Sequence, residues 1–343
     1  MSRRLSTLSF DPELTPGARN AVTVCLRVKP TEIVTIITDD ASKEIAASIA
    51  REVETTGAAY HGWILEEYAS RPLRTMPREI LNDLQGSDVS VYAVFAQPNE
   101  LPTRMQMTEI VTRRRIRHAH MVNISKKIMV QGMRADFLKV DEVTTKVWEI
   151  AKLARHVRAT TKAGTDIAAE FNGKHRWIKT SGIISPDKWG NLPGGEVFTA
   201  PESVQGTFVI DGVVGDYLCA KYGQLREAPL TLLVGKGRLK EIFSDNKELE
   251  DDFWKYTHTD ENSDRVGEFA IGTNIEVREV IGNILQDEKI PGVHIAFGNP
   301  YAEHTGATWY SSTHLDVVGE EFDIWVDDGQ IMRRGEFIFS GGG

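Results

Sequence analysis

In the first half of the chain, apolar runs of strand length alternate with stretches where apolar residues recur every three or four positions. Ile33–Ile37 is a β-branched run, which is typical of a strand buried on both faces. The stripe that follows, at Ile45, Ile49 and Val53, predicts a helix. Further strands are predicted at about 60–65, 89–95 and 121–124, and further helices at about 77–84, 103–115 and 143–155. This alternation predicts a doubly wound parallel α/β domain over residues 1–157.

The pattern changes after about His156, where glycines and other turn residues come every 8 to 12 positions. Two short stretches, Gly235-Lys236-Gly237 and Asp327-Asp328-Gly329, look like hairpin turns, and one helix is predicted at about 247–256. We therefore expect a mostly antiparallel β domain over residues 158–343. Its predicted strands are 178–184, 196–199, 207–214, 230–234, 238–243, 269–272, 293–297 and 322–325.

Composition narrows the class of protein without identifying it. The 343 residues carry 49 acidic and 40 basic side chains, a formal net charge of −9, which argues against a nucleic-acid partner. Cys25 and Cys219 are the two cysteines, and their distance in sequence favours a reduced compartment over a disulfide framework. The sequence has no apolar run near the length of about 18 residues that spans a bilayer. We expect a cytoplasmic protein with no membrane partner.

The candidate chemistry lies mainly near the end of the chain. His314 and Asp316 are two residues apart, so on a strand both side chains point to one face. His294 lies in the apolar run 293–297, and two histidines with one aspartate would leave coordination positions open on a metal ion. Glu196 and Glu268 each lie at the start of a β-rich run, directly after a glycine. Taken alone, a glutamate in such a position is more often a solvated residue.

Another histidine pair, His118 and His120, has the same spacing but follows an arginine-rich stretch. We interpret it as a solvated basic helix end that runs into a strand rather than as a metal pair. The sequence contains no HExxH, GxGxxG or P-loop motif, so the α/β domain shows no nucleotide fingerprint.

Four linked motifs in the second half resemble the thermophilic-type metalloaminopeptidase family, the aminopeptidase T and aminopeptidase S group. In chain order they are Gly-Gly-Glu-Val-Phe-Thr-Ala-Pro, Gly-Glu-Phe-Ala-Ile-Gly-Thr-Asn, Asp-Glu-Lys-Ile-Pro-Gly-Val-His-Ile-Ala-Phe-Gly and His-Leu-Asp, within about residues 160–330. The resemblance implies a homodimer and two divalent ions (Zn, Co, Mn or Mg). It implies as metal ligands Glu196, Glu268, His294, His314 and Asp316. It also places a site tyrosine at Tyr301.

On this interpretation the protein is a metallo-aminopeptidase acting on a small peptide or related amide. The ions would activate a bridging water, Tyr301 would donate to the oxyanion, and Glu196, as a second catalytic residue, could carry a proton to the leaving amine. Either Glu196 or Glu268 would have to bridge the ions.

Two alternatives stay open. Dihydroxypyridine ring-cleaving dioxygenases are similar to the same scaffold and would use one Fe(II) held by His294, His314 and Asp316. Such an enzyme should not need Glu196 and Glu268, and this chain has both. The other alternative is a protein without catalysis whose α/β half mediates assembly, and the presence of all five candidate ligands argues against it.

Overall fold

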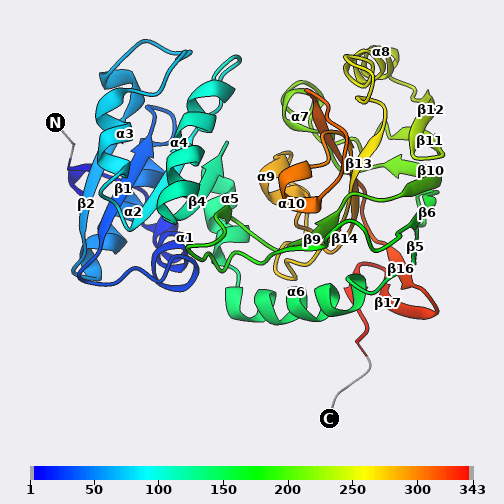
Figure 1. Cartoon of the computed structure of the whole chain (residues 1–343), viewed down its shortest axis with the longest axis horizontal. Coiled ribbons are helices and arrows are strands. Elements are labelled where there is room, and N and C mark those ends of the chain that lie inside the picture. Colours follow the sequence, from blue (N-terminus) through cyan, green and yellow to red (C-terminus); the bar gives the residue numbers. More distant parts are fainter. Residues whose placement is uncertain (1–3, 340–343) are drawn as a thin grey trace. The chain divides into compact units, whose positions relative to one another are not determined.

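The structure, a computed structural model, describes residues 4–339 and divides the chain into two compact units (Figure 1). The first unit contains residues up to 141 together with 181–194, and the second contains 142–180 together with the chain from 195 onward. The expected single boundary after residue 157 differs from this division. The chain changes unit within helix α6 (Phe137–Ala151), and a later segment returns to the first unit.

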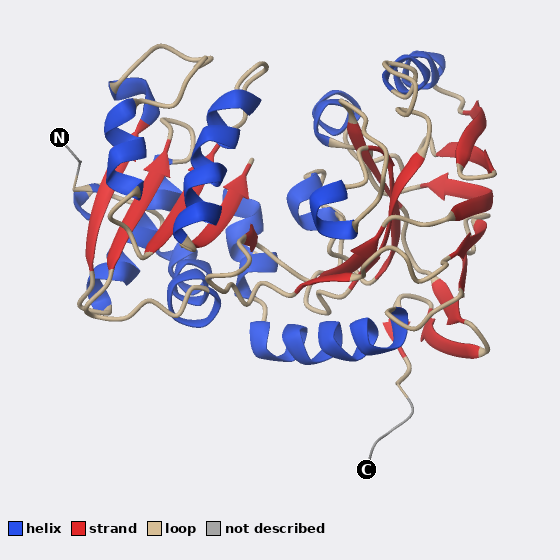
Figure 2. Cartoon of the chain, viewed as in Figure 1, coloured by secondary structure: helices blue, strands red, loops and turns tan. Residues whose placement is uncertain are grey.

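The first unit contains a five-stranded parallel sheet in the order β2-β1-β3-β4-β8, with helices on both of its faces (Figure 2). Ile80 of α3 and Met107 of α4 are buried against Ile37 and Tyr92 of the sheet. The predicted parallel α/β architecture is confirmed. Its strands are β1 (Ile33–Thr38), β2 (Ala59–Ile64), β3 (Val89–Val94), β4 (Arg117–Val122) and β8 (Gly190–Asn191). Its α-helices are α1 (Thr15–Arg19), α2 (Lys43–Thr55), α3 (Arg78–Leu84), α4 (Leu101–Arg114) and α5 (Lys126–Val130). Short 3-10 helices cover Leu5–Thr7, Pro12–Leu14, Leu65–Glu67 and Gly132–Arg134, and a π-helix covers Asn20–Cys25.

Strand β4 corrects one prediction. His118 and His120 are buried, not solvated, because β4 lies between two other strands of the sheet. Ser90 Oγ lies 2.8 Å from His118 Nδ1, and His118 Nε2 lies 3.1 Å from His120 Nδ1. Burial lowers the pKa of His118 to about 3, so the ring is neutral at physiological pH. The two imidazoles therefore satisfy each other inside the first unit.

The second unit contains two antiparallel sheets, which confirms the mostly antiparallel domain. The larger sheet has the order β12-β11-β10-β6-β5-β16-β17-β18 and the smaller one β15-β14-β13-β9-β7. One apolar cluster joins their facing sides, with Phe208 of the larger sheet and Phe269 of the smaller among its members. Both predicted hairpin turns are confirmed, since they join β11 to β12 and β16 to β17. The strands of the larger sheet are β5 (His156–Thr160), β6 (Asp166–Glu170), β10 (Ser203–Ile210), β11 (Leu230–Gly235), β12 (Arg238–Phe243), β16 (Asp323–Val326), β17 (Gly329–Arg333) and β18 (Glu336–Phe337). Those of the smaller are β7 (Ile178–Thr180), β9 (Glu196–Thr199), β13 (Val266–Gly272), β14 (Gly292–Gly298) and β15 (His314–Val318).

Short helices join the strands of the second unit. They are α7 (Asp216–Tyr222), α8 (Lys247–Tyr256), α9 (Ile284–Asp287) and α10 (Ala302–Thr305). Asn246 begins α8 by accepting a hydrogen bond from the backbone N–H of Leu249, as an N-cap residue does. Within residues 4–339, no helix is both long enough and apolar enough to cross a membrane.

Candidate metal centre

The smaller sheet of the second unit has one apolar face and one charged face. Residues at odd positions, such as Phe269, Ile295 and Val317, point into the core between the two sheets. Side chains alternate along a strand, so even-numbered residues of the same strands point to the opposite face. All five predicted metal ligands are at even positions on β9, β13, β14 and β15: Glu196, Glu268, His294, His314 and Asp316. The fold therefore brings them to one face of one sheet.

Small residues stand beside these groups and leave space above the sheet. Ala270 is the cross-strand partner of His294, and Ala296 is the partner of both Glu268 and Asp316. Because directly paired residues have Cβ atoms only about 5 Å apart, a larger side chain at either alanine would fill the space between the ligands.

A β-bulge at Gly267 aims Glu268 at this face. The register of β13 against β14 shifts between Val266 and Glu268, so Val266 points into the core while Glu268 points to the charged face. In a regular strand these two residues would share a face. Glycine fits here because a Cβ atom on Gly267 would lie 2.3 Å from the carbonyl oxygen of Gly298.

Four of the predicted ligands form a continuous chain of near contacts. His294 Nε2 lies 3.6 Å from one oxygen of Glu268, and the other oxygen of Glu268 lies 3.8 Å from His314 Nε2. His314 Nε2 lies 3.3 Å from an oxygen of Asp316. Glu268 thus stands between the two imidazoles.

Glu196 has different neighbours. One of its oxygens lies 2.7 Å from Lys289 Nζ and accepts a hydrogen bond of 3.0 Å from Thr180 Oγ1, while the other lies 3.5 Å from His294 Nε2. Lys289 Nζ also lies 2.5 Å from a carboxylate oxygen of Glu288. Sequence reasoning missed Lys289 and Glu288. The available signal was a charged pair three residues upstream of the apolar run that contains His294.

Within residues 4–339, two groups of side chains have the geometry to hold a metal ion, each with its candidate ligand atoms within 4.8 Å of one another. The first contains Glu196, Glu268 and His294, and the second contains Glu288, His294 and Asp316. Both groups are formed by nitrogen and oxygen ligands, the types that suit Zn, Mn, Co and Fe.

The imidazoles of the site fit metal binding. The Nε2 atom of His294 is buried and has no hydrogen-bond partner, although carboxylates of Glu196 and Glu268 face it. A buried polar atom without a partner is costly, and a bound metal ion would satisfy it. His314 Nδ1 donates a 2.9 Å hydrogen bond to the carbonyl oxygen of Asn299. In the neutral ring this bond leaves the lone pair on Nε2, facing Glu268 and Asp316, as second-shell bonds do at metal sites. The donor set fits a divalent cation.

Burial raises the pKa of two of the acids. It raises the pKa of Glu268 above its ordinary value and that of Glu288 to about 8. Burial acts the same way on Asp316, but the nearby His314 outweighs it and lowers the pKa of Asp316 to about 2. Asp316 is therefore ionised at any physiological pH.

Opposite charges outweigh burial at the remaining groups. Burial would raise the pKa of Glu196, but Lys289 and His294 bring it below its ordinary value. Burial would lower the pKa of His314, but Asp316 raises it to about 10. The pKa of Lys289 is also raised, because its two carboxylate partners outweigh burial. Lys289 is therefore a charged ammonium inside the site.

Tyr301 lies at the rim of the charged face. Its ring centroid is 4.6 Å from that of His314, and the side chain is 37 % exposed. The backbone of Tyr301 has φ +49°, an uncommon value for a tyrosine, at the N-cap of α10. Arg176 closes the other end of α10, where its Nε donates to the carbonyl oxygen of His304 at 2.8 Å and its terminal nitrogen donates to that of Glu303 at 3.2 Å.

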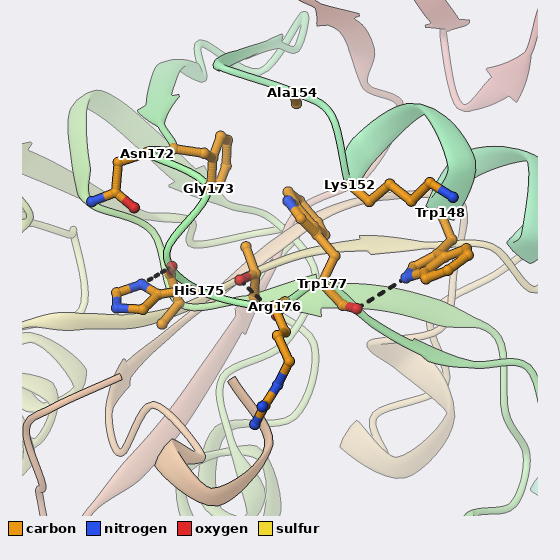
Figure 3. A pocket seen from close by; sticks show the side chains of 11 residues that line it. Trp148, Lys152, Ala154, Asn172, Gly173, His175, Arg176 and Trp177 are labelled. Carbon is orange, nitrogen blue, oxygen red and sulfur yellow. Dashed lines mark hydrogen bonds between the residues drawn. The ribbon is translucent and has the colours of Figure 1, made fainter. Parts of the chain in front are cut away.

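A cavity of about 320 Å³ is lined by Arg176 and, at the end of β9, by Thr199 and Ala200 (Figure 3). Figure 3 shows Trp148 Nε1 donating to the carbonyl oxygen of Trp177. The Nδ1 atom of His175 lies 2.8 Å from the carbonyl oxygen of Ala200. None of the five predicted ligands lines this cavity. Aromatic and cationic side chains, among them Trp177 and Lys152, line the cavity. Arg176 is also part of this lining and hydrogen-bonds to α10.

Comparisons with known proteins show similarities in sequence and in fold. The family model of the thermophilic metalloproteases (M29) matches residues 141–337. The 2,5-dihydroxypyridine 5,6-dioxygenase of Pseudomonas putida KT2440 is 27% identical over 203 residues. That match covers 55% of this chain and 56% of the dioxygenase, so it spans little more than half of either protein.

Two solved structures have a similar fold. One is the 2,5-dihydroxypyridine dioxygenase of Pseudomonas putida KT2440, with a TM-score of 0.68 and 17% identity, covering 95% of this chain and 96% of that one. The other is wild-type AmpT from Thermus thermophilus, with a TM-score of 0.67 and 18% identity, covering 96% and 100%. At these identities the likeness concerns the fold.

The family match covers more than half of the chain and includes every strand of the sheet that carries the charged face. The chain belongs to the thermophilic metalloprotease family (M29).

Proposed function

We propose that the protein is a metal-dependent hydrolase of the aminopeptidase type, which cleaves the first residue from a peptide or opens a related amide bond. The observation that carries the proposal is the convergence of Glu196 and Glu268 on His294, beside the His314–Asp316 pair. A mononuclear oxygenase needs two imidazoles and one carboxylate, whereas this face presents two imidazoles with additional acids. Family membership supports the same reaction class.

Bound divalent ions would supply a Lewis acid for the scissile carbonyl and would lower the pKa of an attacking water toward neutrality. Glu268, His294, His314 and Asp316 would hold metal, since their donor atoms follow one another at 3.3–3.8 Å. The sequence resemblance implies two ions (Zn, Co, Mn or Mg). The ammonium of Lys289 lies among the candidate ligands and competes with a second ion for them. The homodimer and the cytoplasmic location stay predictions.

Two further side chains have roles in this proposal. Tyr301 is a neutral phenol at the rim beside His314, and its hydroxyl would donate to the oxyanion that develops on the substrate. One oxygen of Glu196 is fixed by Lys289 and Thr180, while the other faces the ligand cluster. Because its pKa is below the ordinary value, Glu196 is ionised and can accept a proton and pass it to the leaving amine.

The second candidate is a ring-cleaving dioxygenase with one Fe(II) held by His294, His314 and Asp316. The similarity to the Pseudomonas putida dioxygenase favours it. Against it, Glu268 faces both imidazole Nε2 atoms, at 3.6 and 3.8 Å, and would occupy a position that oxygen chemistry requires open.

The test compares the two activities on one preparation. We expect hydrolysis of a panel of aminoacyl amides and no oxygen uptake on dihydroxylated pyridines. Tyr301→Phe should lower kcat for the amide by about 10²–10³-fold, the cost of losing one oxyanion donor, with metal content unchanged. The matched control is Tyr310→Phe, an exposed tyrosine nine positions on, which should behave as wild type. Oxygen uptake with bound iron and no amide hydrolysis would refute the proposal.

A further inference from the structure

Lys289 is an unusual component of a metal centre. Its side chain is 1 % exposed, and its ammonium lies 2.7 Å from Glu196 and 2.5 Å from Glu288. The backbone fixes it there, since the Lys289 carbonyl oxygen accepts a 3.0 Å hydrogen bond from the N–H of Asn274. A buried charge of this kind persists only where counter-charges and hydrogen bonds compensate its lost hydration. The lysine is thus an integral cation of the site.

The two partners of Lys289 are informative. The two candidate ion-binding groups share His294, and Lys289 pairs with one acid from each, Glu196 from the first and Glu288 from the second. A neutral imidazole has one nitrogen lone pair, so Nε2 of His294 can bind one ion and not two. The two groups therefore cannot both bind an ion through that atom. The acid that distinguishes each group, Glu196 or Glu288, is already in contact with the ammonium of Lys289.

The remaining predicted ligands follow one another across the charged face. From His294 through Glu268 and His314 to Asp316, successive donor atoms lie 3.6, 3.8 and 3.3 Å apart. Nitrogen and oxygen ligands lie about 2.0–2.2 Å from zinc, so ligands of the same ion lie about 3–4 Å from one another. Each successive pair of these donor atoms therefore has the spacing of two ligands of one cation.

We propose that Lys289 takes the place of a second metal ion, so that the site holds one divalent cation on Glu268, His294, His314 and Asp316. The ammonium pairs with Glu196 and Glu288 and keeps them in position, but it offers no vacant coordination site. This inference rests on the proposed function only in requiring that the charged face binds metal. It departs from the two ions that the sequence resemblance implies.

The first measurement is the number of Zn²⁺ or Mn²⁺ ions bound per chain, by equilibrium dialysis followed by elemental analysis. We expect one ion in the wild-type protein. Two ions would overturn the inference and leave the proposed hydrolase intact. No bound metal would refute the metal centre itself, and the inference with it.

The second measurement uses Lys289→Met, which keeps an unbranched side chain one atom shorter and removes its charge. Glu196 and Glu288 then lack a cation, and we expect a second ion to bind when metal is in excess. The matched control is Lys179→Met, in the neighbouring strand β7, whose ammonium contacts Thr145 Oγ1 at 2.9 Å, and it should bind one ion. A folded Lys289→Met protein that still binds one ion would contradict the proposal.

A pair of glutamine substitutions tests the same assignment with Lys289 in place. Glu196→Gln removes a partner of the lysine and should retain one bound ion. Glu268→Gln removes a ligand that faces both imidazoles and should weaken binding by at least tenfold. Loss of the ion from Glu196→Gln, with Glu268→Gln unaffected, would reverse the two roles and overturn the inference even if Lys289→Met failed to fold.

Discussion

The affinity of the site for a divalent cation should rise steeply with pH. In the metal-free protein burial disfavours the charged imidazolium of His314, but Asp316 outweighs it and raises the pKa to about 10. A metal ion binds the neutral ring, so at pH 7 it must displace a proton from a group whose pKa lies about three units above the pH. At about 1.36 kcal/mol per unit this costs about 4 kcal/mol, or roughly a thousandfold in affinity relative to pH 10.

The expected slope is therefore about tenfold per pH unit between pH 7 and 10 from His314 alone. Asp316, with a pKa of about 2, is ionised over this whole range and adds nothing to the slope. Competition against a chelator at pH 6.5, 7.5 and 8.5 measures the slope. Calorimetry in two buffers of different ionisation enthalpy counts the released protons, and we expect about one or more per ion at pH 7.

A control and a refuting result follow from the same numbers. His258→Gln changes an exposed histidine of the same unit, and it should keep the wild-type slope. An affinity that is constant from pH 6.5 to 8.5, with no proton released on binding, would show that His314 is not a ligand or is neutral before metal binds.

Stability of the metal-free protein should change in the opposite direction. The folded-state pKa of His314 lies above the value of about 6.5 for an unperturbed histidine. Its contribution to folding is therefore complete below pH 6.5 and is lost as pH rises through about 10. Thermal melts with a chelator should show a falling Tm from pH 7 to 10, and saturating Zn²⁺ should diminish or reverse that fall. Parallel pH dependences with and without metal would contradict the assignment.

Three substitutions test other parts of the site. His314→Ala should abolish activity and metal binding, so that added Zn²⁺ no longer raises the Tm, and an active, metal-replete variant would rule out its role as a ligand. Arg176→Ala removes two charge-assisted hydrogen bonds to the end of α10, each worth about 1.5–3 kcal/mol. Tyr301 should then be less well positioned, so kcat should fall while bound metal stays constant; an unchanged kcat would show that α10 needs no such anchor. Ala296→Val adds two methyl groups between Glu268 and Asp316 and should weaken metal binding at least tenfold, as measured by dialysis, whereas wild-type affinity would show that the space between the ligands is not needed.

Elements that begin directly after a local signal in the sequence could be predicted from it. Strands β9 and β12 and helix α8 have the predicted bounds, because glycines or an N-cap asparagine precede them. Strands β5 and β6 were not predicted. Each buries only one branched residue and one alanine, and alanine is a weak indicator of a strand.

The site could be predicted only in part. Histidines and acids at alternate positions of apolar strands leave a recognisable pattern, and the structure brings all five to one face. Lys289 and Glu288 leave no such pattern, since they follow α9 and precede β14 outside any periodic segment. A buried ion pair becomes evident only when the partner, here Glu196, is known, and that residue is 93 positions away in the sequence. His118 and His120 were misassigned for a similar reason, because the neighbouring arginines suggested exposure that the sheet prevents.

The placement of the ligands on separate strands also determines when the site can form during folding. Glu196 and Asp316 are 120 residues apart, and the strands that carry them meet only through β13 and β14. Such non-local pairings form late, because loop-closure entropy opposes them until much of the sheet is assembled. A metal ion should therefore bind after the rate-limiting barrier, slowing unfolding and leaving the refolding rate nearly unchanged. A retained metal ion would then stabilise the second unit kinetically. Its removal would raise the unfolding rate of the native state more than it would lower the refolding rate.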